Sequence, residues 1–136
     1  MDISQMSRLP ATITAIESQD ILNIVTFSSK NFQLKMVSLE LDERATIGRS
    51  VIVGAKATTV AIAKDFEGVL SFSNQIPLTI KSIQQGKIVS NLILKEESFE
   101  LESIITTESL LRMQLQKNQN VIALIKSSDL SIVEFL

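Results

Sequence analysis

The chain repeats itself once, and this internal repeat limits what it can fold into. Residues 4–16, "SQMSRLPATITAI", align with residues 71–83, "SFSNQIPLTIKSI", at an offset of 67 residues (71 − 4 = 67). The same offset places Phe32 on Phe99 further along the chain. A repeat of this length indicates one small structural unit that is used twice.

The repeat divides the chain into two domains of similar size. Lys56 aligns with Lys126 at an offset of 70 (126 − 56 = 70), so the second copy carries three additional residues. The charged segment "KDFEG", residues 64–68, is the most loop-like stretch between the copies. We therefore expect a first domain at residues 1–66 and a second domain, with the fuller binding motif, at residues 67–136.

Each copy has the pattern of about five short strands. Residues 11–16 and 78–83 alternate apolar and polar side chains, as half-buried strands do. Residues 50–64 and 120–135 each predict two strands that are interrupted after a lysine. Good helix formers follow Thr106 up to Gln116, with Thr106 as N-cap. The fold class predicted is all-β, with two tandem OB-like five-stranded barrels and a short helix in the second.

The strand before Lys126 is apolar on both faces. Ile122 and Leu124 share a face with Lys126, and Ile52 has the corresponding place in the first copy. One face of such a strand fills its own barrel, and the other has to pack on the second barrel or on another chain. We expect that a monomer would leave this outer face partly exposed, so that the chain self-associates with Lys126 at the rim of the interface.

Composition narrows the classes of function. The chain has no Cys and no His, so thiolate and imidazole groups are absent for catalysis or for binding a transition metal. It has no Trp or Tyr and a net charge of −2, which disfavours binding to nucleic acid or to an anionic membrane. No apolar run reaches the roughly 18 residues of a membrane span, and no signal peptide is recognisable. We expect a cytoplasmic protein that is not an enzyme and contacts neither nucleic acid nor membrane directly.

Hydrogen-bond donors gather near the predicted strand ends of the second copy. These donors are Ser71, Ser73, Asn74, Thr106, Ser109, Lys126, Ser127 and Ser128. Hydroxyl and amide donors with one lysine suit a small oxyanion, whereas a hard cation needs carboxylate oxygens. Each group also has a structural interpretation: a solvated lysine, a helix cap and a serine-rich turn. Glu108 would repel an anion unless its side chain points away.

Three segments in this order resemble a known family. "SFSNQIPLTIKSI", "IITTES" and "ALIKSSDLSI", within residues 71–132, look like the Mop domain, the molybdate-binding member of the TOBE group. "LPATITAI" and "VGAKATTVAIA" in the first copy resemble a weaker member. The tandem arrangement is similar to the di-Mop molbindins, and it also resembles the ligand-sensing half of a molybdate-responsive transcription regulator.

The resemblance implies a bound molybdate or tungstate, no organic cofactor and no bare metal cation. The residues it implies as ligands are Ser71, Asn74, Thr106, Ser109, Lys126 and Ser127, with Lys56 and Ala57 in the first copy. We include Ser4, which aligns with Ser71, and Ser73, which replaces the family's arginine. The first copy has Leu39 and Asp42 where the helix-start donors should be, so its site is degenerate. The family places sites between barrels or subunits and favours a trimer.

The leading hypothesis is therefore the storage or homeostasis of molybdate or tungstate in the cytoplasm. The alternative is a regulatory sensing module that acts with a DNA-binding regulator or a molybdate-transporter ATPase. An oligonucleotide-binding barrel is a third possibility, against which the acidic charge and the absence of stacking aromatics argue.

Overall fold

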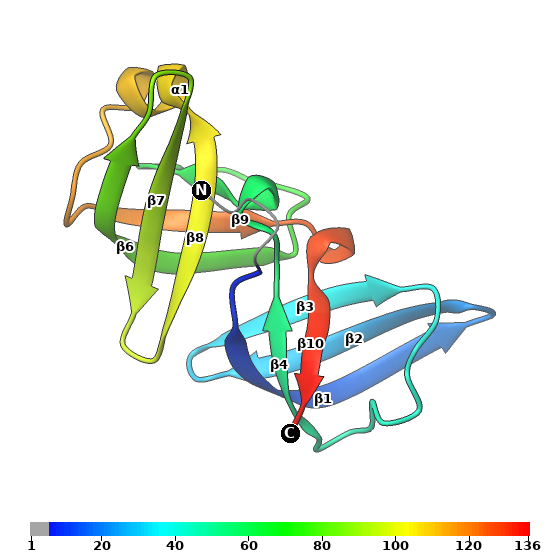
Figure 1. The fold of residues 1–136 in the computed structure, drawn as a ribbon. Helices are drawn as coiled ribbons and strands as arrows, with labels where there is room; N and C mark the ends of the chain where they lie inside the picture. Colours follow the sequence, from blue (N-terminus) through cyan, green and yellow to red (C-terminus); the bar gives the residue numbers. More distant parts are fainter. Residues whose placement is uncertain (1–5) are drawn as a thin grey trace.

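The chain folds into two antiparallel five-stranded sheets (Figure 1). The structure, a computed structural model, describes residues 6–136. The first sheet has the spatial order β10-β4-β1-β2-β3 and the second the order β5-β9-β6-β7-β8. The strands are β1 (Leu9–Gln19), β2 (Leu22–Ser29), β3 (Phe32–Ser38), β4 (Ser50–Gly54), β5 (Ala61–Ala63), β6 (Asn74–Gln85), β7 (Val89–Glu96), β8 (Phe99–Thr106), β9 (Asn120–Ile125) and β10 (Ser131–Phe135). The helices are α1 (Thr107–Arg112) and the 3₁₀ turns η1 (Ala57–Thr59) and η2 (Ser127–Asp129).

The two copies exchange their last strands. β5 follows the first copy's lysine, yet it pairs with β9 in the second sheet, with Ile62 opposite Ala123. β10 follows the second copy's lysine and pairs with β4 in the first sheet, with Ser131 opposite Gly54. Figure 1 shows β10 lying beside β4, far along the sequence from its neighbours. The sheets therefore cannot separate without breaking two backbone ladders.

The backbone repeats as the sequence does. The β1–β2 and β6–β7 ladders both shift register directly after equivalent residues, Ile13 and Ile80. The carbonyl of Ile13 accepts a hydrogen bond from the Gly48 amide at 2.7 Å, and that of Ile80 from the Asn118 amide at 2.8 Å. Gly48 and Asn118 both have positive φ, 92° and 73°, a conformation that favours glycine or asparagine. The predicted internal repeat is thus visible in the bulges and turns.

The two copies also pack on each other with approximate two-fold symmetry. Asn74 binds the backbone of Lys35 through both polar atoms, accepting from the amide at 2.7 Å and donating to the carbonyl at 2.9 Å. In the equivalent positions, the Ser7 hydroxyl accepts from the Glu102 amide at 3.1 Å. Both partners are related by the offset of the repeat (74 − 7 = 67 and 102 − 35 = 67). Equivalent residues therefore make equivalent contacts across the interface, as in an isologous dimer.

Two equivalent phenylalanines meet each other at this interface. Phe32 and Phe99 contact edge to face, with ring centroids 5.7 Å apart and planes inclined by 70°. A residue can touch its own counterpart only near a two-fold axis, so this pair marks the local axis of the chain. Buried side chains of both copies form one continuous apolar cluster around it.

The prediction of barrels is confirmed in part. The chain is all-β with a short helix in the second copy, but within residues 6–136 no backbone ladder joins β5 to β8 or β10 to β3. β5 lies against β8, and the Ser103 hydroxyl donates to the Val60 carbonyl at 2.6 Å across this gap. The equivalent of Ser103 in the first copy is Met36, which is buried and has no hydroxyl. Neither sheet is therefore closed into a barrel by a backbone ladder among the described residues.

The expectation of a partly exposed face on the strand before Lys126 is wrong for Leu124 and Ile52, whereas Ile122 is half-buried. Leu124 and Ile52 are 7% and 9% exposed, so both are buried within the chain. The sequence did not indicate that β9 pairs with β5 and β4 with β10, which places the other copy next to both strands. None of the described helices has the length and apolar character of a membrane span.

Gly54 generates a testable prediction about the exchanged strand. A Cβ atom at this position would lie 2.1 Å from the Ser7 carbonyl oxygen and 2.9 Å from the Val133 side chain of β10. Gly54→Ala should therefore destabilise the protein by about 1–3 kcal/mol, the usual cost of overpacking. Urea unfolding measures the change, and Ser131→Ala, at the exposed residue paired with Gly54, is the control with an expected change within about 0.5 kcal/mol. Equal midpoints for Gly54→Ala and wild type would contradict the close approach of these strands.

Candidate functional site

The two lysines that the repeat aligns adopt the same backbone conformation. Lys56 has φ −66° and ψ 140°, and Lys126 has φ −66° and ψ 147°. Each precedes a 3₁₀ turn in which its carbonyl accepts a backbone hydrogen bond at 2.9 Å, from Thr59 and from Asp129. Both side chains are exposed, and both turns lie where the two sheets meet (Figure 1). The predicted strand–lysine–hydroxyl pattern is thus one structural element used twice.

Most of the predicted ligands of the second copy lie at the end of the second sheet that carries Lys126. Asn74 begins β6 opposite Ile125, the residue before Lys126. Ser71 and Ser73 lie in the exposed segment that leads into β6, and Ser127 opens η2. We call this group the lysine end: Ser71, Ser73, Asn74, Lys126 and Ser127.

Asn74 differs from its neighbours because its side chain is fully buried. Its carbonyl oxygen accepts from the Lys35 amide and its amide nitrogen donates to the Lys35 carbonyl, so both polar atoms are engaged by the first copy. Asn74 therefore anchors the start of β6 to the first sheet, and a role as oxyanion ligand stays a prediction.

Thr106 and Ser109 form the second group of predicted ligands, which we call the helix end. The Thr106 hydroxyl accepts from the Ser109 amide at 3.1 Å and donates to the Ser109 hydroxyl at 3.0 Å, as expected for an N-cap. Arg112 donates to the Ser109 hydroxyl at 3.1 Å and to Glu108 at 2.9 Å. The helix is shorter than predicted because Gln114 adopts a positive φ of 53° and ends the regular conformation.

The lysine end and the helix end lie at opposite ends of the second sheet. Thr106 pairs with Val89 beside the β6–β7 turn, close to Gln85 at the end of β6. Asn74 starts β6 at its other end. Figure 1 shows α1 at the far tip of the second sheet, away from the junction where η2 lies. A single chain therefore does not gather all the predicted ligands around one point.

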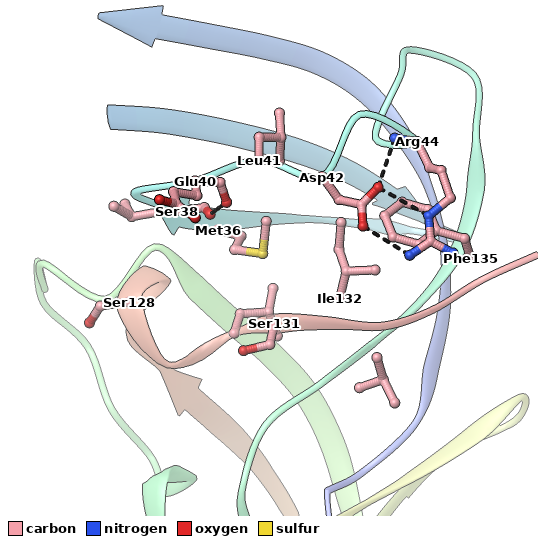
Figure 2. Close-up of a pocket in the computed structure, with 13 residues that line it drawn as sticks. Met36, Ser38, Glu40, Leu41, Asp42, Arg44, Ser128, Ser131, Ile132 and Phe135 are labelled. Atoms are coloured by element: carbon pink, nitrogen blue, oxygen red, sulfur yellow. Dashed lines mark hydrogen bonds and ion pairs between the residues drawn. The ribbon is translucent and has the colours of Figure 1, made fainter. Parts of the chain in front are cut away.

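The first copy has an ion pair at the position equivalent to Ser109. Asp42 accepts hydrogen bonds from Arg44 at its Nε (3.0 Å), its Nη2 (2.9 Å) and its backbone amide (2.9 Å). The Arg44 guanidinium also lies 4.4 Å from the centre of the Phe135 ring of β10. These residues line an open pocket with Met36 and Ser128 (Figure 2). The hydrogen bonds from Arg44 lower the pKa of Asp42 from 3.8 to about 2, so the carboxylate stays ionised.

The remaining predicted residues of the first copy contribute little polar chemistry. Ala57 is 1% exposed and offers no polar side chain, and Leu39, the equivalent of Thr106, is 62% exposed. Ser4 lies outside the described residues. In the described part of the chain, no group of acidic residues has the arrangement of a metal site.

The sequence analysis did not predict two contacts of the site, that of Arg112 with Ser109 and that of Asn74 with Lys35. Arg112 stands three residues after Ser109, a spacing that places both on one face of a helix and could have revealed the contact. The bond from Asn74 to Lys35 joins residues 39 apart and has no local sequence signal.

Comparisons with known proteins agree with the predicted resemblance. The family model of the TOBE domain matches residues 70–132. The fold matches a crystal structure of the cytoplasmic molybdate-binding protein ModG with molybdate bound, with a TM-score of 0.88 and 25% sequence identity. The match covers 97% of this chain and 98% of that chain. No curated protein matches the chain. The resemblance to a tandem Mop/TOBE protein is thus confirmed.

The pairing of Asp42 with Arg44 predicts an acid-shifted titration. Because the pKa in the folded protein is depressed, the stabilisation is complete above the ordinary value of 3.8 and is lost as the pH falls through about 2. An NMR titration of the Asp42 carboxyl carbon should give a midpoint near 2, which Arg44→Ala should return towards 3.8. Arg49→Ala, which removes only a weaker charge contribution, is the control and should leave the midpoint low. A midpoint near 3.8 in the wild type would show that the ion pair does not form.

Proposed function

We propose that this chain binds molybdate or tungstate and stores or buffers the oxyanion in the cytoplasm. The observation that carries the proposal is the fold shared with ModG along nearly the whole of both chains, together with the TOBE match of the second copy. A role as a sensing module is less favoured, because the similar structure is described as a molybdate-binding protein. We also propose that the chain is not an enzyme, in agreement with this likeness and with the absence of His and Cys.

The chemistry of the predicted ligands supports an oxyanion as the bound species. Ser71, Ser73, Ser127 and the helix-end hydroxyls are donors, and Lys126 supplies a positive charge. A molybdate dianion has no proton at neutral pH, so each of its oxygens can accept from such donors. Phosphate is partly protonated and would place an O–H donor against them. Sulfate is smaller than molybdate and would leave some donors of a rigid cavity unpaired.

We propose that each complete site lies between two chains. The helix end of one chain would meet the lysine end of another, since the two ends of one sheet are too far apart to share a small ion. Exposed apolar side chains at the helix end support such an interface: Ile88 is 76% and Leu111 59% exposed. Ile21, the equivalent of Ile88, is 69% exposed at the corresponding turn of the first copy. A homotrimer is the proposed assembly.

The finer description of the domains is also a proposal. We propose that residues 1–66 and 67–136 are two Mop-like repeats, each a small OB-like barrel that the other copy's last strand completes. The repeated bulges after Ile13 and Ile80 support this division, as does the contact between Phe32 and Phe99. The ion pair of Asp42 supports a degenerate site in the first repeat.

Removing Lys126 tests the site directly. Losing a hydrogen bond to a charged group costs about 1.5–3 kcal/mol, which is roughly a 10- to 150-fold change in Kd. Lys126→Ala should cost at least this much, because the dianion would lose its counter-charge at the lysine end. Lys56→Ala is the matched control with the same backbone conformation, and it should weaken binding within about tenfold. Titration calorimetry with molybdate measures both; a larger loss from Lys56→Ala would show that the first copy holds the working site.

Selectivity is the second test of the proposed ligand. A ligand that binds only the folded protein at about 100 times its Kd adds roughly 2.7 kcal/mol of stability. Molybdate and tungstate should therefore raise the melting temperature, and sulfate at the same concentration should raise it less. An equal shift with sulfate, or none with molybdate, would contradict the proposal.

The mass of the oligomer in solution tests the proposed homotrimer. Light scattering at micromolar concentration should give three times the chain mass of 15.0 kDa. Leu111→Glu, which puts a charge into the exposed apolar surface of the helix end, should shift the mass towards the monomer. A monomer mass for the wild type with and without molybdate would overturn the placement of the site between chains.

A further inference from the structure

We propose that Arg112 is an oxyanion-binding residue, whose guanidinium binds the ion together with Thr106 and Ser109. This inference rests on the proposed function and adds to it a second positive charge, at the end of the sheet opposite Lys126.

The contacts of Arg112 place it beside the predicted ligands. Its Nη2 donates to the Ser109 hydroxyl at 3.1 Å, and this hydroxyl also accepts from Thr106 at 3.0 Å. Among the described residues, it is the only arginine or lysine whose side chain is hydrogen-bonded to a side chain of the predicted site.

A second positive charge beside Lys126 would strengthen the binding of a dianion. A dianion that leaves water is stabilised when two positive charges compensate it, and one lysine supplies a single charge. A guanidinium presents several N–H donors in a planar fork that suits two oxygens of a tetrahedral oxyanion. With Lys126 from one chain and Arg112 from another, the bound dianion would be neutralised from both sides.

Glu108 holds Arg112 in the absence of the ion and would release it. The carboxylate accepts from Arg112 Nε at 2.9 Å, but the two side chains are 69% and 63% exposed. An exposed ion pair of this kind contributes little to stability, so an incoming dianion can replace the carboxylate. Glu108 then competes with the ligand for Arg112. Removing its carboxylate should therefore raise the affinity for the oxyanion, whereas removing the guanidinium should lower it.

The first copy provides the matched comparison. Arg44 contacts Asp42, the equivalent of Ser109, as Arg112 contacts Ser109 itself. Because Asp42 is a carboxylate bound by both the side chain and the backbone of Arg44, this arginine is already neutralised where an anion would have to bind. Arg44→Ala is therefore the control for the loss of a surface arginine.

Titration calorimetry with molybdate on the full chain tests the proposal through four variants. Arg112→Ala should weaken binding by about tenfold or more, as expected when a charged hydrogen bond is lost. Arg112→Lys should weaken it less, because the charge is kept and the fork is lost. Glu108→Gln should tighten binding, because the competing carboxylate is removed. Arg44→Ala should leave the affinity unchanged.

The outcomes separate this inference from the proposed function. If the wild type does not bind molybdate, both are overturned. If the wild type binds and Arg112→Ala binds equally well, only the role of Arg112 is overturned. If Glu108→Gln weakens binding as much as Arg112→Ala does, the ion pair merely holds the helix, and the inference is overturned as well. Urea unfolding of each variant identifies any loss of affinity that follows from loss of the fold.

Discussion

The packing of the two copies around a local two-fold axis is the constraint on which the rest of the structure depends. Phe32 meets Phe99 on this axis, and Asn74 and Ser7 each bind the backbone of the opposite copy. The exchange of β5 and β10 adds a backbone ladder on each side. Since neither sheet is complete without a strand from the other copy, the chain behaves as one unit made of two repeats.

This packing also determines where the binding chemistry can lie. The chain crosses from one sheet to the other through a lysine and a 3₁₀ turn in each copy. Lys56 and Lys126 therefore both lie at the junction of the sheets. The hydroxyls of Thr106 and Ser109 lie at the outer tip of the second sheet instead. A small oxyanion that contacts both groups would therefore have to lie between two chains. The core of one chain is filled by apolar side chains.

Much of the fold could be predicted because its signals are local. The alternation of the strands and the cap at Thr106 are short-range patterns, the repeat is visible by aligning the sequence with itself, and the structure has all three. The strand exchange could not be predicted, since a strand of three residues such as β5 carries no information about its partner. The burial of Leu124 on the outer face of β9 was missed as well. In the site, residue types indicated the chemistry, but not that Asn74 is engaged by a backbone 39 residues away.

A mixing experiment tests the central claim, that two chains build each site, most directly. Lys126→Ala removes the positive charge of the lysine end and Ser109→Ala removes a hydroxyl of the helix end, so neither variant alone should bind molybdate well. Unfolding the two together and refolding them as mixed oligomers should restore part of the binding, because some interfaces then join an intact helix end to an intact lysine end. If the mixture binds no better than the separate variants, while mixed oligomers have formed, each site belongs to a single chain and the account is wrong.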